Sequence, residues 1–238
     1  MGLDVSELEP VSRRSTAEIV ADRIWPSLQL LLASIGLTLA VSIPLGVIAA
    51  VYRKHWIGSA VMVLAFTGYA VPAFVLAIFM ILVFSYTLNW LPVVGNGSAA
   101  HFIMPTIAMS GVLIAALTRF TRNAMLDVLG QDFIRTARAK GLPELWVVLK
   151  HGLGNASITV ISVIGLQIAG LAAAGSVVVE SIFSWPGIGE LLVTSAIVRD
   201  YPLLQFGVIT VAVAVVVINA ITDIAYALAD PRIRLARS

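Results

Sequence analysis

The residue types that carry most catalytic and metal chemistry are few and scattered in this sequence of 238 residues. There is no cysteine, and the three histidines, His55, His101 and His151, lack the spacing of a metal-binding motif. There is also no Gly-x-x-x-x-Gly-Lys-Ser/Thr loop to hold a nucleotide phosphate, and no nucleophile paired with a base in the apolar segments. We therefore expect no catalytic residue, no metal, no cofactor and no ATP hydrolysis by this chain itself.

Four polar side chains lie within otherwise apolar stretches, where an ionisable or amide group calls for a reason. Glu180 and Asp223 lie near the ends of their stretches, within reach of interfacial water, so they do not favour a proton relay. Gln167 and Asn219 lie nearer the middle. Gln167 either contacts a solute or bonds to a neighbouring backbone.

The longest polar connection, residues 119–151, has the pattern of two short helices joined by a turn. The run from Asp132 to Lys140 consists of helix formers, with an acid at its start and a cation at its end, as the helix dipole favours. Gly141 suits the position just after a helix, and Pro143 suits the first turn of a second helix that runs toward Gly152. The alternative is a solvated basic loop held near anionic lipid.

The elements that carry these residues are predicted to be membrane-spanning helices. Hydrophobic residues make up 59% of the chain and charged residues only 12%, whereas a soluble domain has about 25% charged residues. A bilayer core of about 30 Å needs about 20 apolar residues. Five segments meet that length, at residues 28–51, 59–86, 102–118, 156–183 and 203–228. The predicted fold class is an all-α integral membrane protein, with a polar segment over 1–27 and a transmembrane domain over 28–238.

The distribution of basic residues assigns a side of the membrane to each connection. Lys and Arg concentrate after the first and third spans and at the carboxyl end, whereas only Arg199 lies between Phe183 and Leu203. The 119–151 connection and the carboxyl terminus are therefore predicted to be cytoplasmic. The amino terminus would then be outside, although Arg13, Arg14 and Arg23 oppose that placement, which suggests a missing upstream segment. The net charge of +2 is explained by this pattern, and no nucleic acid is expected.

Small residues recur at four-residue spacing along the fourth predicted span, at Gly165, Ala169 and Ala173. Such a stripe allows close helix packing in lipid. It packs either within the chain or against a second subunit, where Gln167 would join it in lining a passage.

The sequence SWPGIG, which follows the fourth span, breaks the helix, and the apolar stretch after it is too short to cross a membrane. We expect an interfacial or re-entrant helix at the outer mouth, with Trp185 at the membrane interface. It is either a plain surface helix or an outer gate or docking surface, formed by Glu180, Trp185, Pro186 and Gly187.

The run FIRTARAKGLPELWVVLKHGLGN resembles the cytoplasmic EAA loop of permease subunits of binding-protein-dependent ABC importers, closest to the dipeptide, oligopeptide and nickel branch. The small-residue triplet of that loop falls on Arg135 to Ala137, and its glycine falls on Gly141. Its initial glutamate and later proline are absent, as is usual in the peptide branch. Other matches follow in order along the chain, at IPLGVIAA, NWLPVVGNGS, VVVESIFSWPGIG, RDYPLLQ and ALADPRIR.

The resemblance implies a MetI-like ABC permease fold, here with its first span and external segment missing. It implies a non-enzymatic subunit that forms half of a passage for peptides, nickel or a similar small solute in the bacterial or archaeal plasma (inner) membrane. The implied partners are a second homologous permease subunit, cytoplasmic ATP-binding subunits and an external solute-binding protein. Contact with the ATP-binding subunits would involve Asp132, Arg135, Thr136, Ala137, Lys140 and Gly141. The alternative is a secondary, ion-coupled transporter, which would need midplane ion-coupling residues or inverted repeats.

Overall fold

The computed structural model describes residues 15–229, and all regular elements in that range are helical. Three π-helical segments, η2 to η4, continue α-helices directly. In chain order the elements are α1 (Thr16–Val51), α2 (Trp56–Ala70), α3 (Ala73–Met80), η2 (Ile81–Thr87), α4 (Ala99–Leu129), α5 (Asp132–Ala139), α6 (Glu144–Trp146), η3 (Val147–Leu153), α7 (Gly154–Gly170), η4 (Leu171–Gly175), α8 (Ser176–Ile182), α9 (Ile188–Val198) and α10 (Tyr201–Ala229).

The first helix begins well before the predicted start at residue 28. Ser15 Oγ accepts from the backbone N–H of Glu18 at 3.2 Å, and the Glu18 carboxylate accepts from the N–H of Ser15 at 3.0 Å. This reciprocal pair is a capping box, which satisfies two backbone donors at a helix start. Residues 16–27, predicted as part of a polar amino-terminal segment, therefore belong to α1. Arg13 and Arg14 lie outside the described residues.

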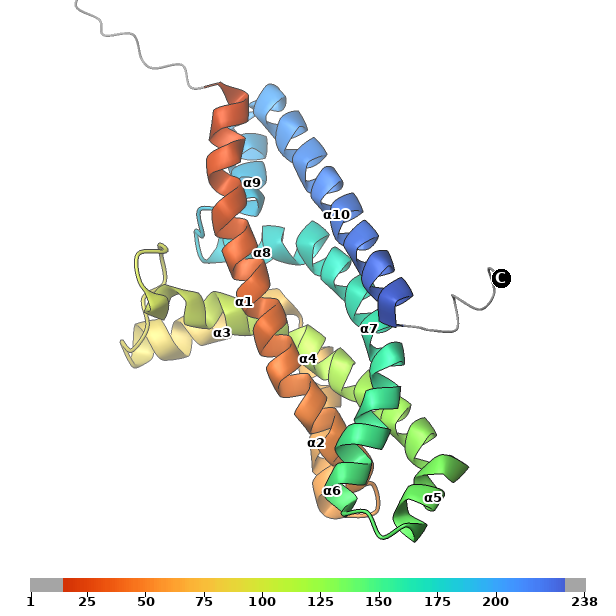
Figure 1. Ribbon diagram of the computed structural model, residues 1–238. Helices are drawn as coiled ribbons and strands as arrows, with labels where there is room; N and C mark the ends of the chain where they lie inside the picture. Colours follow the sequence, from red (N-terminus) through yellow and green to blue (C-terminus); the bar gives the residue numbers. More distant parts are fainter. Residues whose placement is uncertain (1–14, 230–238) are drawn as a thin grey trace, which may run out of the picture.

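The second predicted span is not a continuous helix. Pro72 precedes α3, and Val71 has the extended backbone, with φ −87° and ψ 117°, that a residue before proline prefers. The helix axis consequently bends by 95° between α2 and the α3–η2 segment, and Figure 1 shows α3 turned away from α2.

The third predicted span is longer than expected, because α4 continues from residue 118 to Leu129. Residues 119–129, which the sequence assigned to a connection, are therefore helical. The guanidinium of Arg119 lies over the ring of Tyr69 in α2, 5.2 Å from its centroid. This is a cation–π contact, which joins the basic residue of α4 to an aromatic side chain of α2.

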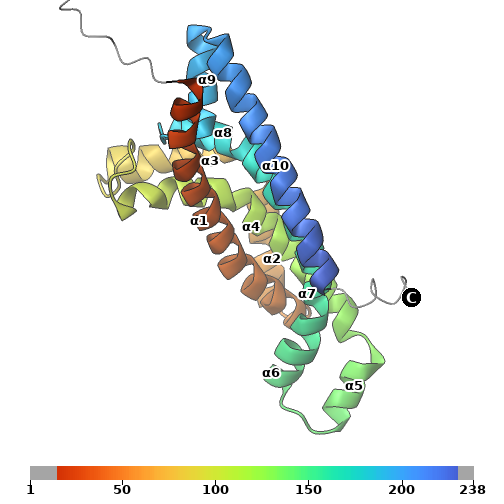
Figure 2. The ribbon, with the colours of Figure 1, turned by 45° about the horizontal axis from the view of Figure 1, so that its top comes forward.

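The fourth predicted span is helical throughout but changes direction. Its residues are divided among α7, η4 and α8, and both ribbon views show α8 turned away from the axis of α7 (Figures 1 and 2). A π-helical segment is a recognised cause of such a bend. By length and composition, three helices of the described range, α1, α4 and α10, can each cross a membrane, and the bent α2–α3 pair makes a fourth, against five predicted.

The helices place the polar connections at two opposite ends. The turn between α1 and α2 lies at the same end as α5 and α6, whereas α9 and the start of α10 lie beside the beginning of α1 (Figures 1 and 2). One buried cluster, including Leu30, Met104 and Trp185, fills the α9 half. A second, including Met125 and Ile134, fills the half next to α5.

The most extensive helix contact in the described range is between α1 and α4. Ser34, Thr38, Ser42 and Gly46 are buried at four-residue spacing along α1. A Cβ placed on Gly46 would lie 2.5 Å from Thr121 Cβ and 2.9 Å from the backbone oxygen of Thr118. These small side chains therefore bring the two backbones close together, as small residues do between helices in lipid.

We expect Gly46→Ala to destabilise the protein, because the added methyl has no room between α1 and α4. Overpacking of this kind costs about 1 to 3 kcal/mol. The matched control is Gly36→Ala in the same helix, where no atom lies within 4 Å of the added Cβ; it should be neutral or gain about 0.5 to 1 kcal/mol. The measurement is the thermal unfolding midpoint of the purified protein in detergent. Equal midpoints for the two variants would contradict the close approach.

Candidate functional site

The helix pair predicted between residues 132 and 152 is present at the end of α4. The first helix, α5, begins at Asp132 and ends at Ala139, just before Lys140. The second begins after Pro143 as α6, and it continues through η3 directly into α7 without a break at Gly152. The pair is therefore joined without an intervening loop to α7, and by a short connection to α4.

Gly141 shapes the turn between the two helices. Its φ is +75°, a left-handed conformation that side-chain-bearing residues rarely adopt. Its N–H donates to the carbonyl oxygen of Arg138 at 2.9 Å, closing the end of α5. A Cβ added at this position would have no atom within 4 Å. The backbone conformation, and not a shortage of space, therefore favours glycine here, as the sequence predicted.

An ion pair closes the turn from the other side. Arg138 Nε donates to Glu144 Oε2 at 3.0 Å, and its terminal nitrogen Nη2 donates to Oε1 at 2.6 Å. Hydrogen bonding to Arg138 lowers the pKa of Glu144, so the pair's contribution to stability is present at neutral pH and disappears as the pH falls through that lowered pKa. Both side chains are about half exposed, so the pair is worth less than about 1 kcal/mol. Its main effect is to orient α6 relative to α5.

The two faces of α5 differ in what they contact. Ile134 and Ala137 are buried in the cluster that contains Val147 and Met125. The sequence placed Phe133 and Ala137 on one face, but Phe133 is exposed, because Ile134 and not Phe133 takes the inner position beside Ala137. Ala137 therefore faces the protein's own core. The other predicted contact residues are exposed, namely Asp132, Arg135, Thr136, Lys140 and Gly141.

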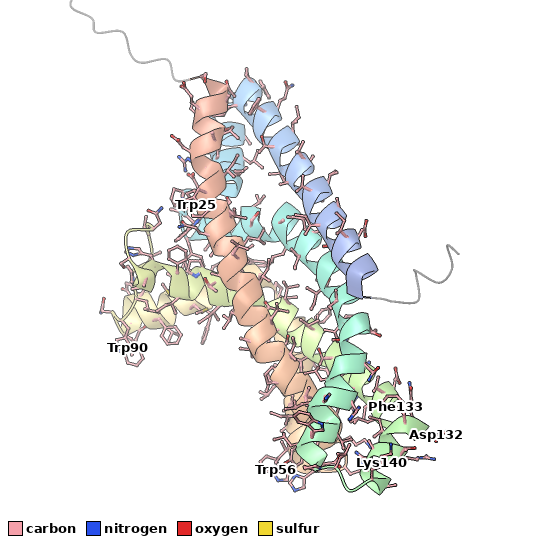
Figure 3. All side chains as sticks on the ribbon, viewed as in Figure 1. Trp25, Trp56, Trp90, Asp132, Phe133 and Lys140 are labelled. Carbon is pink, nitrogen blue, oxygen red and sulfur yellow. The ribbon has the colours of Figure 1, made fainter. Side chains whose placement is uncertain are left out.

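The exposed side of the helix pair combines charged and large apolar side chains. Arg135 and Asp132 form an ion pair at 3.3 Å with both side chains largely in solvent. In Figure 3, Asp132, Phe133 and Lys140 project from the α5 region at the end of the molecule. Exposed large apolar residues on the pair are Phe133, Leu142, Leu145, Trp146 and Leu149. Exposed apolar side chains among charges are typical of a protein-binding surface; we call these five residues the apolar patch.

The small residues of the fourth predicted span pack within the chain where the structure describes them. Gly165 lies directly against Thr222 of α10, which leaves no space for a side chain. Ala169 is buried. Gln167 lines a small pocket with residues of α1 and α4, including Thr38 and Leu117. Packing within the chain, one of the two alternatives for this stripe, therefore holds for Gly165. The side chain of Ala173 lies outside the described residues.

The segment predicted as an outer gate is held tightly against α1. Trp185 is fully buried inside the protein. Its indole Nε1 donates to the carbonyl oxygen of Pro26 at 2.9 Å, and its ring meets the edge of Phe102 at a centroid distance of 4.5 Å. Pro186 is partly buried and Gly187 is buried. The predicted short apolar helix is present as α9.

Glu180 is the buried acid of this region, with no exposed surface. Its Oε2 accepts from the backbone N–H of Gly189 at 2.7 Å, and both Oε2 and Ser27 Oγ lie beside Gly187. Nearby, Arg23 pairs with Glu190 at 2.8 Å. The sequence did not identify Arg23, Pro26, Ser27 or Glu190. The signal available in the sequence was Glu180 itself, because an acid buried in an apolar helix needs polar partners.

The chemistry of both regions is therefore that of packing and docking. Among the described residues, no group of three or more His, Asp or Glu side chains is arranged to hold a metal ion. The helix pair offers a rigid exposed surface, and the α9 region offers a set of hydrogen bonds between distant segments.

Comparison with known proteins gives a consistent result. Residues 42–235 match the family model described as binding-protein-dependent transport system inner membrane component. The chain is 44% identical over 227 residues to the glutathione transport system permease protein GsiC of Shigella flexneri serotype 5b (strain 8401), covering 95% of this chain and 74% of that protein. The GsiC protein of Escherichia coli (strain K12) matches with the same identity and coverage.

A solved structure has the same fold. The inward-facing MetNI methionine ABC transporter contains a chain that superposes with a TM-score of 0.75, covering 89% of this chain and 96% of that chain at 17% sequence identity. At that level of identity the likeness concerns the fold alone.

Proposed function

Because this chain belongs to the family of inner membrane components of binding-protein-dependent transport systems, we propose that the α5–α6 pair is the surface through which it meets the ATP-binding subunits. The chain is a permease subunit of an ABC importer, a transport component and not an enzyme. Such importers work with ATP-binding subunits and a solute-binding protein. The proposal concerns the surface on which this chain meets the ATP-binding subunits.

The observation that carries the proposal is the contrast between the two sides of α5. The inner side, with Ile134 and Ala137, is packed into a buried cluster shared with α4 and η3. The outer side of α5 carries the charged residues and Phe133, and the other members of the apolar patch lie on the turn, α6 and η3 beside it. A force applied to the outer side would therefore pass to α4 and α7 as a rigid-body movement. Asp132, Arg135, Thr136 and Lys140 contact the ATP-binding subunit directly, whereas Ala137 and Gly141 hold the shape of the pair.

The proposed orientation places the α5–α6 end in the cytoplasm. Arg53 and Lys54 lie in the turn at the same end as this pair, as the positive-inside rule requires. Exposed Trp56 lies at that end of the molecule, whereas exposed Trp25 and Trp90 lie farther from it (Figure 3). Tryptophan favours membrane interfaces, so Trp56 supports an interface near the α5–α6 end.

The proposed solute is a short peptide. The support is the identity of 44% to relatives named as permeases of a glutathione transport system. A second homologous permease subunit would complete the passage, and an external binding protein would deliver the solute. Ni²⁺ is the alternative solute.

The coupling proposal predicts that Gly141→Ala uncouples transport. The methyl is placed at φ +75°, which costs about 1 to 2 kcal/mol, so the turn relaxes and α5 is misdirected. In vesicles containing the complete importer, ATP hydrolysis stimulated by glutathione and its binding protein should fall at least about fivefold. Ni²⁺ is tested in parallel as the stimulating solute and should not replace glutathione.

Gly154→Ala is the matched control for this experiment. Gly154 also has no atom within 4 Å of an added Cβ, but it lies in regular helix, so its variant should keep its stimulation. With membrane levels matched, full stimulation in Gly141→Ala would show that the turn does not couple the subunits.

The orientation proposal predicts labelling from opposite sides of the membrane. The chain contains no cysteine, so Gly97→Cys and Leu142→Cys each introduce a single thiol. Gly97 has open space around it, and Leu142 is exposed. A membrane-impermeant maleimide should label residue 97 from outside in intact cells and residue 142 only after the membrane is opened. Labelling of both from the same side would contradict the proposed topology.

A further inference from the structure

We propose that Glu180 is a positioning residue that joins α9 to α1, so that the two helices move as one unit during transport. The proposal rests on the chain being an importer permease, and not on the role of the α5–α6 pair. We call the six residues involved the α9 anchor: Arg23, Pro26, Ser27, Glu180, Trp185 and Glu190.

The need for an anchor arises where α9 begins. A helix start leaves backbone N–H groups without partners inside the helix, and a polar side chain at the N-cap position usually accepts from them. In α9 that position is Gly187, which has no side chain. The N–H of Gly189 donates instead to Glu180 Oε2 at 2.7 Å, and the N–H of Ile188 donates to Ser27 Oγ at 2.8 Å. Acceptors from α8 and α1 thus replace the missing cap.

Glycine is required at the start of α9 by the same contacts. A Cβ on Gly187 would collide with Glu180 Oε2 and Ser27 Oγ. A Cβ on Gly189 would lie 2.5 Å from Val177 Cα and 3.0 Å from Glu180 Oε2. The backbone of α9 therefore lies directly against α8, and no other residue could occupy these positions without displacing the buried carboxylate.

Two further contacts join this region to α1, both within residues 23–27. The carbonyl oxygen of Pro26 accepts from the Trp185 indole at 2.9 Å, and Arg23 pairs with Glu190 in the first turn of α9 at 2.8 Å. The contacts bridge more than 150 positions of sequence and include a charge-assisted pair that is only partly exposed. Hydrogen bonds to a buried charge are among the stronger polar contacts in a protein.

Glu180 is central because it lies where α9 and α1 meet. Its Oε2 accepts from the N–H of Gly189 in α9, and Oε2 and Ser27 Oγ of α1 both lie beside Gly187. Loss of the carboxylate would leave the N–H of Gly189 without its acceptor in a buried place. The contacts of Ser27, Pro26 and Arg23 would remain, but the start of α9 would be held less firmly against α8 and α1.

The first experiment fixes α9 to α1 covalently. In the otherwise cysteine-free chain, Arg23→Cys with Glu190→Cys replaces the ion pair with two thiols, which a short bifunctional thiol reagent joins. Assembled with the complete importer in vesicles, the joined protein should transport within about twofold of the unjoined double variant. Arrest of transport by the cross-link would overturn the proposal, because it would show that α9 must move relative to α1. This test needs no substitution of Glu180.

The second experiment tests Glu180 itself. Spin labels on Trp25→Cys in α1 and Ile197→Cys in α9, both exposed positions, report the distance between the helices. The distance should be narrow and unchanged between nucleotide-free and ATP-bound importers. Glu180→Ala should broaden it and reduce transport, whereas Glu180→Gln should restore both, because the amide oxygen still accepts from Gly189.

Two outcomes of the second experiment would overturn the proposal. One is a distance in the unaltered protein that changes with nucleotide. The other is a Glu180→Ala variant that keeps a narrow distance and full transport. Loss of stimulated ATP hydrolysis in Gly141→Ala but not in Gly154→Ala leaves the coupling proposal standing, so its outcome is read separately from that of Glu180.

Discussion

The start of α9 must find hydrogen-bond acceptors inside an apolar protein, and much of the fold follows from how it does so. Unpaired backbone groups are costly in such surroundings. The acceptors come from Glu180 in α8 and Ser27 in α1, so those helices must meet at this point. Trp185 is thereby drawn into the core against Phe102 of α4. The position of α9 in turn determines where α10 begins, only a few residues later.

The helices α1 and α4 connect the two functional ends of the molecule. Residues 23–27 of α1 hold α9, and the later turns of α1 pack closely on α4 around Gly46. After Leu129 the chain passes almost directly into α5, whose inner face is buried with residues of α4. Movement proposed to enter at α5 therefore reaches α9 through two tightly packed helices, because packed interfaces transmit displacements and deform little.

The sequence predicted the features that depend on neighbouring residues. The α5–α6 pair, the left-handed turn at Gly141 and the short helix α9 all follow from local composition and glycine or proline placement. Prediction from the sequence failed where contacts between distant segments determine the structure. Trp185 bonds to Pro26, Arg119 in the longer α4 lies over Tyr69, and Gly165 packs on Thr222. The sequence predicted one span over residues 59–86, but the helix axis bends there by 95° at Pro72.

The most direct test of the account is to find which surface of the chain touches the ATP-binding subunit. A photoreactive amino acid placed singly at Phe133 or Leu145 lies on the apolar patch, whereas at Trp90 it is exposed and lies away from that patch. In the assembled importer, illumination should trap the ATP-binding subunit from positions 133 and 145 and not from position 90. Trapping from position 90, or none from either patch position in a complex that hydrolyses ATP normally, would contradict the account.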